Sequence, residues 1–444
     1  LTLKASRDVI VNADITSTAG ALSLVLNAHA ENDTASGRVR ISGATIDTNG
    51  GSLTIGGGLN PATTAAIGLG SITGEANRGV SLSGATITTG AGAIRIAGDG
   101  GSDGANGSNR GIETSGTTIT TTSGAITLIG RGSHANGTGN TGIVVGSGTT
   151  VQSTSGAISL DGSGGSNTGG LFSDYGIQIA SGAHILSSGT APISLRGINP
   201  NTSLRGIWAD STAQIGGAAA TGAITLEADE LTLDSTASVQ GHGDLTLRPA
   251  DLSASVTVGG STGSFPLTAA TLAALQDGFS MIHIGRADGS GTITVATAAF
   301  KDAVTIGNGD PSGKILVSGA LSTGSGTEAG TITLQAGDSV TLQSGSSITT
   351  QNRAVVLNAA RSGAGAVVLT SAAITTNGGA LTMGGGVPSS GDTPTGPAVG
   401  TATNPAGIGI AGSTILTGGG AITLRGTGYT GLTNSHGIAL TGTT

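Results

Sequence analysis

The feature that most constrains the fold is a phrase that recurs along the first half of the chain. Each copy reads G-[IV]-x-x, then G-x-x-[IV]-x-x-x-x-G, then A-[IV]-x-[LI], and closes with a stretch rich in Gly, Ser and Asn. The isoleucine of the last motif falls at nearly even intervals along the chain, at Ile94, Ile126, Ile158, Ile193 and Ile224. A steady period of this length is typical of stacked supersecondary units.

Within each copy the aliphatic residues alternate, as they do in a β-strand that buries one face. In the segments 125–128 and 176–179 the aliphatic side chains occupy every second position. Three short strands per copy, with glycine at the corners, predict one coil of a β-helix, whose coils pair at about 4.8 Å spacing. One inward aliphatic ladder is predicted to contain Ile46, Ile87, Ile119, Val151, Ile185 and Ile215.

A second, longer repeat relates the beginning of the chain to its end. Residues 37–58 align without gaps with residues 365–386, and residues 79–98 align with residues 407–426 at the same offset of 328. The loops between these segments differ almost completely in sequence. A tandem repeat of this length favours a fibrous protein, because an enzyme rarely needs a third of itself again.

The two repeats together predict the domain organisation. We expect residues 1–328 to form the first long unit of a continuous β-solenoid, and residues 329–444 to be the first third of a second copy. The first unit divides into coils over 1–249, an irregular segment over 250–290 and compact coils over 291–328. Because no initiator Met or signal peptide is apparent and the last phrase is incomplete, we interpret the sequence as an internal part of a longer precursor.

The irregular segment contains the only convincing helix pattern of the sequence. Thr268 is a suitable N-cap, Leu272 and Leu275 fall on one face, and Gly278 follows as a stop, which predicts a short helix near 268–277. We expect this helix to be an outward excursion that packs on the side of the solenoid. The strands predicted beyond it follow one another more closely, so the later coils should be shorter and carry fewer loops.

The composition fits a solenoid and disfavours several other classes of protein. Glycine provides 83 of 444 residues and only 9% are charged, whereas a disordered chain combines low hydrophobicity with high charge. The absence of cysteine removes disulfides and thiolate metal sites. The net charge of −8 argues against a nucleic-acid partner. No apolar run approaches the roughly 20 residues of a membrane-spanning helix.

The sequences of the repeats also resemble those of a known protein family. The segment DGF…IHIGRADGSGTITV, set among GAITL and TTNGGALTMGGG phrases, resembles the tandem repeats of very large bacterial filamentous-haemagglutinin-like exoproteins. The resemblance is one of repeat style and covers essentially the whole chain. It implies a right-handed parallel β-helix located at the bacterial surface or in the extracellular space. The family is associated with two-partner secretion, adhesion and biofilm formation.

Aromatic residues are scarce, at 2% of the chain, and three of them occur within little more than one coil: Phe172, Tyr175 and Trp208. By alternation Ile207 points inward, so Trp208 is predicted to point outward in a column with Ser81, Glu113, Val144 and Gln178. An outward Trp beside a Tyr can stack on a sugar ring or another apolar partner. These three residues are therefore the candidate ligand-binding site, with surface glycans as the candidate partner. Alternatively, the rings cover one another or a loop.

A β-helix protein that binds or cleaves polysaccharides is the alternative function. Cleavage needs carboxylates that converge within about 5–10 Å, and the acids are densest at Asp229, Glu230, Asp234, Asp244 and Asp251. We interpret these acids as residues that solvate an edge, and we expect no catalytic residue, metal or cofactor. Two weaker patterns are a Gly/Asp-rich loop over 98–106, which is similar to calcium-binding repeats, and a Thr-x-Thr array typical of ice-binding solenoids, which breaks off after two coils.

The sequence thus predicts a non-enzymatic shaft segment of an extracellular bacterial fibre or adhesin. Its stacked coils would project from the cell surface, or assemble there, for attachment or biofilm formation. Neighbouring copies of the chain in a filament or bundle are a further candidate partner. Many weak contacts along a tandem array can add up to strong attachment through effective concentration.

Overall fold

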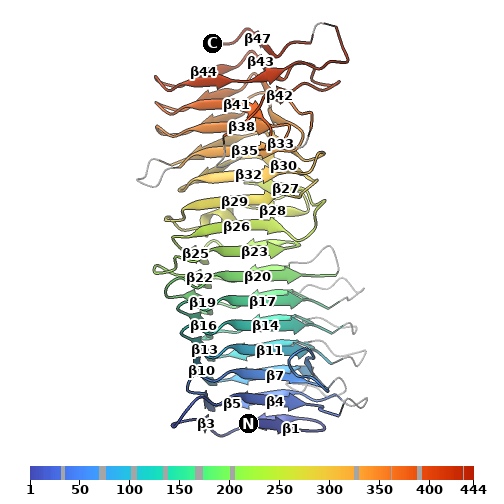
Figure 1. The fold of residues 1–444 in the computed structure, drawn as a ribbon, viewed down its shortest axis with the longest axis vertical. Coiled ribbons are helices and arrows are strands. Elements are labelled where there is room, and N and C mark those ends of the chain that lie inside the picture. The colour runs from blue at the N-terminus through green and yellow to red at the C-terminus, as the bar shows by residue number, and fades with distance from the viewer. Residues whose placement is uncertain are drawn as a thin grey trace. The chain divides into compact units, whose positions relative to one another are not determined.

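The computed structural model describes residues 1–31, 36–69, 77–101, 108–133, 139–165, 174–200, 206–324, 330–361, 363–387, 393–433 and 435–444. The chain divides into two compact units, Leu1–Gly243 (unit 1) and Asp244–Thr444 (unit 2). Within each unit, short strands follow one another as stacked coils (Figure 1). The predicted all-β solenoid fold is confirmed.

In the described part of unit 1, each coil contributes one strand to each of three parallel sheets. The first sheet contains β1 (Thr2–Lys4), β4 (Leu24–Ala28), β7 (Leu53–Gly57), β11 (Ile94–Asp99), β14 (Ile126–Arg131), β17 (Ile158–Ser163), β20 (Ile193–Ile198) and β23 (Ile224–Ala228), with β8 (Ala66–Ile67) beside β11. The second contains β2 (Val9–Val11), β5 (Val39–Ser42), β9 (Val80–Ser83), β12 (Ile112–Ser115), β15 (Ile143–Val145), β18 (Ile177–Ile179), β21 (Ile207–Ala209) and β24 (Leu231–Leu233). The third contains β3 (Ile15–Thr16), β6 (Thr45–Asp47), β10 (Thr86–Gly90), β13 (Thr118–Thr121), β16 (Thr150–Ser153), β19 (His184–Ser187), β22 (Gln214–Gly216) and β25 (Ser238–Gln240).

Unit 2 repeats this plan with parallel strands in its described residues. Its first sheet contains β26 (Asp244–Pro249), β29 (Met281–Arg286), β32 (Val304–Asn308), β35 (Ile332–Ala336), β38 (Val355–Ala359), β41 (Leu381–Gly385) and β45 (Ile422–Leu424). The second contains β28 (Phe265–Leu267), β27 (Val256–Val258), β30 (Thr292–Val295), β33 (Lys314–Val317), β36 (Val340–Leu342), β39 (Val367–Thr370), β43 (Ile408–Ala411) and β47 (Ile438–Thr441). The third contains β31 (Ala298–Phe300), β34 (Ala320–Thr323), β37 (Ser347–Thr349), β40 (Ala373–Thr375) and β44 (Thr414–Leu416), and a separate pair joins β42 (Ala398–Val399) to β46 (Gly426–Thr427).

The predicted inward ladder of unit 1 is confirmed. The register of the third sheet places its members side by side, in the order Ile46, Ile87, Ile119, Val151, Ile185 and Ile215. Each of these side chains is 0–1% exposed. Since full burial of one aliphatic side chain stabilises a protein by about 1.5–3 kcal/mol, such ladders help to hold one coil on the next.

Stacking accounts for this burial, as two isoleucines related by the long repeat demonstrate. Ile94 in β11 lies between β7 and β14 and is 1% exposed. Ile422 in β45, the last strand of its sheet, has a neighbour only on the β41 side and is 51% exposed. The same residue at the same place in the coil is therefore buried or half-exposed according to whether a further coil covers it.

The long repeat extends to the backbone conformation. Asn49 and Asn377, which the repeat relates to one another, have φ angles of 49° and 48° in the left-handed region. The strands β39, β40 and β41 begin at the positions that the same offset gives from β5, β6 and β7. Further pairs with positive φ at this offset are Gly43 and Ser371, Gly50 and Gly378, Gly58 and Gly386, Gly84 and Gly412, and Gly90 and Gly418. The same coil is thus built twice, although the division into repeat copies after position 328 stays a prediction.

The predicted helix is present but shorter than the span suggested near 268–277. Helix α1 covers Ala269–Ala273, and the Thr268 side chain caps it by accepting a hydrogen bond from the Thr271 N–H. It contacts β28 and β31, as expected for an excursion that packs on the side of the coils. The helix ends early because the chain turns away: Leu275 is buried, and the N–H of Gly278 donates to the Asp302 carboxylate at 3.0 Å. No helix formed by the described residues has the length and apolar character needed to cross a membrane.

Asp302 makes the stability of this segment depend on pH. The side chain is 1% exposed, and burial raises its pKa to about 6, although N–H groups of Gly278 and Phe279 bind the carboxylate. The charge of Asp277 raises the pKa further. The native state therefore holds this proton at a higher pH than the unfolded chain, for which the pKa is 3.8. The contribution of Asp302 to stability is therefore highest at low pH and falls as the pH rises from about 4 to about 6.

An Asp302→Asn variant removes this titration. Between pH 4 and pH 7.5 we expect the variant to gain up to roughly 3 kcal/mol of unfolding free energy relative to the wild type. Urea unfolding of both proteins at the two pH values measures the gain. Asp310→Asn is the matched control, because the Ser312 hydroxyl and N–H lower the pKa of Asp310 and move its titration below this range. A difference between wild type and Asp302→Asn that does not change with pH would contradict the expectation.

The coils of unit 2 that directly follow the helix are shorter than the coil of unit 1 that runs from Ile94 to Ile126. In the first sheet of unit 2 Ile282 pairs with Val304, and Val304 pairs with Ile332. In unit 1 the corresponding step runs from Ile94 to Ile126 and contains more residues than either of these two steps. The core geometry is kept while the connections between strands change length.

Candidate functional site

Two of the three candidate aromatic residues meet on the outside of unit 1. Tyr175 precedes β18 and Trp208 lies in β21; their ring centroids are 5.0 Å apart and the ring planes are inclined by 45°. Both side chains are half-buried. Phe172, the third candidate, lies outside the described residues. Tilted rings at this separation attract one another, so the pair forms a preordered aromatic surface.

The register of the second sheet confirms the predicted column around Trp208, in which Ser81 and Val144 are buried. Its members lie side by side in the order Ser81, Glu113, Val144, Gln178, Trp208 and Thr232. Ile207, beside Trp208 in the chain, is fully buried and points inward as expected. Glu113 forms ion pairs with Arg110 at 2.6 Å and with Arg78. The column therefore combines charged, apolar and polar side chains on one face.

This arrangement contains features of both interpretations of the aromatic residues. The two rings cover part of each other, as the structural alternative expected. The indole also lies between Gln178 and Thr232, so an apolar surface is flanked by groups that can hydrogen-bond to a polyol. Ligand binding by Tyr175 and Trp208 stays a prediction. Titration of the Trp208 fluorescence with neutral oligosaccharides would test it, since an unchanged spectrum excludes stacking on the indole.

A buried amide ladder, which was not among the sequence-based predictions, leads to Tyr175. Its members each come two positions before the glycine of a G-[IV] motif and are 0–2% exposed: Asn77, Asn109, Asn140 and Asp174. The backbone N–H of Asn109 donates to Oδ1 of Asn140 at 3.2 Å, and the N–H of Asn140 donates to Oδ1 of Asp174 at 2.7 Å. The recurrence of these residues at a fixed place before each G-[IV] motif was a visible signal for the ladder.

Asp174 ends the described ladder with a carboxyl group in place of an amide. Burial raises the pKa of this carboxyl, while N–H groups of Asn140 and Gly139 act in the opposite direction. Its backbone carbonyl accepts a hydrogen bond from the side-chain amide of Asn199 in the next coil. The ladder thus fixes the corner from which Tyr175 reaches Trp208.

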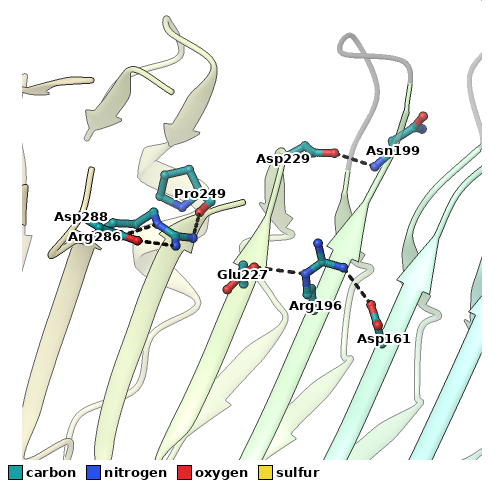
Figure 2. A network of polar contacts seen from close by, with 8 residues as sticks. All are labelled: Asp161, Arg196, Asn199, Glu227, Asp229, Pro249, Arg286 and Asp288. Carbon is teal, nitrogen blue, oxygen red and sulfur yellow. Dashed lines mark hydrogen bonds and ion pairs between the residues drawn. The ribbon is translucent and has the colours of Figure 1, made fainter. Parts of the chain in front are cut away.

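A polar network crosses three adjacent strands of the first sheet in unit 1 (Figure 2). Arg196 donates from Nη1 to Asp161 at 3.1 Å and from Nε to Glu227 at 3.2 Å. Burial alone lowers the pKa of Arg196, but the hydrogen bonds and charges of the two carboxylates raise it overall. Because Arg196 is 44% and Asp161 50% exposed, these ion pairs contribute little stability and mainly bridge neighbouring coils.

The acidic residues of the alternative, polysaccharide-cleaving interpretation each accept a hydrogen bond within the described residues. Their donors are the N–H of Asn199 for Asp229 (2.6 Å, Figure 2), the Thr232 hydroxyl for Glu230, the N–H of Thr236 for Asp234, the Ser280 hydroxyl for Asp244 and the N–H of Ser253 for Asp251. These contacts match the interpretation of the acids as edge and turn residues. Within the described ranges no three His, Cys, Asp or Glu side chains are grouped as metal ligands. Most of the loop over 98–106 lies outside those ranges.

Comparisons of this chain with protein-family models, with curated proteins and with solved structures find no match. The resemblance to filamentous-haemagglutinin-like exoproteins therefore rests on the repeat phrases of the sequence. Any inference about function therefore rests on the coils and on the side chains that they present.

Proposed function

We propose that the chain is a structural shaft segment of an extracellular bacterial fibre or adhesin, which projects from the cell surface or assembles there for attachment or biofilm formation. The observation that carries the proposal is the repetition of the coil backbone in the long repeat, down to the positive φ angles of Asn49 and Asn377. A body in which each coil covers the apolar ladder of the previous one is lengthened by adding identical units.

The positions of the long connections support a role in attachment. In unit 1 the longest connections follow strands of the first sheet, for example after β11, β14 and β17. Because β11, β14 and β17 are neighbours in register, these connections begin side by side at one corner of the coils, where sequence variation does not disturb the core. Each added unit repeats the same edge, so the number of weak contacts increases and together they give strong attachment through effective concentration.

Electron microscopy of chains with one, two and three tandem copies of residues 1–328 tests the shaft. We expect particle length to grow by on the order of 50 Å per copy, since residues 1–328 contain eleven strands of the first sheets and each coil adds about 4.8 Å. A matched control omits one strand per copy, residues 126–131, so that the coils no longer pair continuously. Three-copy particles that are no longer than one-copy particles, or controls that lengthen equally, would contradict the proposal.

A further inference from the structure

Unit 2 has a polar groove on the outer face of its first sheet, over the strands β26, β29, β32 and β35. Gly285 and Gly307 are paired directly in β29 and β32, and Gln335 in β35 is the next partner of Gly307. Arg248 projects from β26 on the other side. Because two adjacent strands lack side chains at this level, a hollow of about 450 Å³ remains between the flanking long side chains.

The groove concentrates positive charge in an acidic chain. Three guanidinium groups line it, from Arg248, Arg286 and Arg361, together with the imidazole of His283. Among the described lining residues the one carboxylate is that of Asp288. The chain as a whole has a net charge of −8 and contains 17 Lys and Arg residues, so three arginines around one hollow are a local reversal of its charge.

The rim of the groove already holds a carboxylate that belongs to the chain. Arg286 donates to both oxygens of Asp288, at 2.9 and 3.2 Å, and its Nη1 donates to the Pro249 carbonyl at 3.1 Å (Figure 2). The hydrogen bond from Arg286 lowers the pKa of Asp288, and the nearby charge of Arg248 lowers it as well. The Arg286 fork is therefore fixed in place, and the field of the groove favours the ionised form of a carboxyl group.

We propose that this groove binds a carboxylate-bearing sugar residue of an acidic polysaccharide. The carboxylate would lie against Arg248 and Arg361, because a guanidinium matches the geometry of a carboxylate and donates two parallel hydrogen bonds. The hydroxyl of Thr246 lines the same groove and can both donate to and accept from sugar hydroxyls. This site is separate from the aromatic pair and goes beyond the shaft function.

Calorimetric titration of the full chain with digalacturonate tests the proposal, with the neutral disaccharide digalactose and inorganic phosphate as the comparison ligands. We expect digalacturonate to bind, digalactose to bind at least about tenfold more weakly, and Arg248→Gln and Arg361→Gln each to weaken digalacturonate about tenfold or more. Arg425→Gln is the matched control, since Arg425 follows β45 outside the groove and donates to the Pro394 carbonyl. Its affinity is expected to equal that of the wild type.

A second variant tests the hollow without changing any charge. A side chain at Gly307 would meet only Gln335, at 3.2 Å from its carbonyl oxygen, so Gly307→Leu fills the groove with a small adjustment. We expect it to abolish binding while the thermal unfolding midpoint is kept; if the variant unfolds, the two arginine variants decide. The proposal is overturned if digalacturonate does not bind, if phosphate binds as tightly, or if Arg248→Gln and Arg361→Gln bind like the wild type.

Discussion

In the chain of residues 1–444, an Ile94→Ala substitution is expected to lower the free energy of unfolding by about 3 kcal/mol, whereas Ile422→Ala should lower it by less than about 1 kcal/mol. The two isoleucines occupy the same place in the coil in the two copies of the long repeat. Ile94 is covered by coils on both sides and is 1% exposed, while Ile422 is 51% exposed. Alanine at position 94 therefore leaves a cavity between coils, whereas alanine at position 422 removes side-chain atoms that are already half in water.

Urea unfolding followed by far-UV circular dichroism measures both variants. Thr127→Ala in β14 serves as the matched surface control, because its side chain points away from the core and the change should be within about 0.5 kcal/mol of the wild type. Equal losses for the variants at positions 94 and 422 would show that burial between coils is not what stabilises the ladder.

The second large effect is expected from a methyl group at Gly124. A Cβ there would lie 1.9 Å from the carbonyl oxygen of Gly92 in the neighbouring coil, and a Cβ at Gly156 would lie 2.0 Å from the carbonyl oxygen of Gly124. These contacts are with backbone atoms, which cannot rotate away as the end of a side chain can. We expect Gly124→Ala to lower the free energy of unfolding by about 3 kcal/mol or more.

Gly20→Ala is the matched control for this clash. A Cβ at Gly20 meets no atom within 4 Å, so alanine there should be neutral or stabilising by about 0.5 kcal/mol through the unfolded chain. Thermal unfolding of the two variants and the wild type compares them directly. If the Gly124→Ala protein is as stable as the Gly20→Ala protein, adjacent coils can separate locally. That result would contradict the expectation that the close backbone contact at this corner of unit 1 leaves no room for a Cβ.

The sequence was sufficient for the parts of the fold that follow from alternation at a steady spacing. In most strands of unit 1 inward and outward positions alternate, and the step from Ile94 to Ile126 is repeated with little change as far as Ile224. The Ile46 ladder and the column of Trp208 could therefore be predicted residue by residue. Helix α1 was predicted from its cap and its two leucines. Its end at Ala273, however, depends on the hydrogen bond from Gly278 to Asp302, two residues that are distant in the sequence.

The groove of unit 2 could not be predicted in this way. Its stacked residues are separated by steps of unequal length, so no period reveals that Gly285, Gly307 and Gln335 are neighbours. Arg248 precedes them by a connection that contains the helix. The amide ladder of unit 1 is the opposite case, because its asparagines recur at nearly constant spacing, although the more frequent glycines mask this signal in the sequence.

The agreement of backbone angles between the two copies of the long repeat has a consequence for how such a gene can change. Unequal recombination between two copies joins a strand of one copy to the following strand of another, and strands such as β5 to β7 and β39 to β41 are interchangeable in length and register. Every product of such an exchange contains only complete coils. Adding or removing a whole copy would therefore change the length of the protein without interrupting the pairing of its coils.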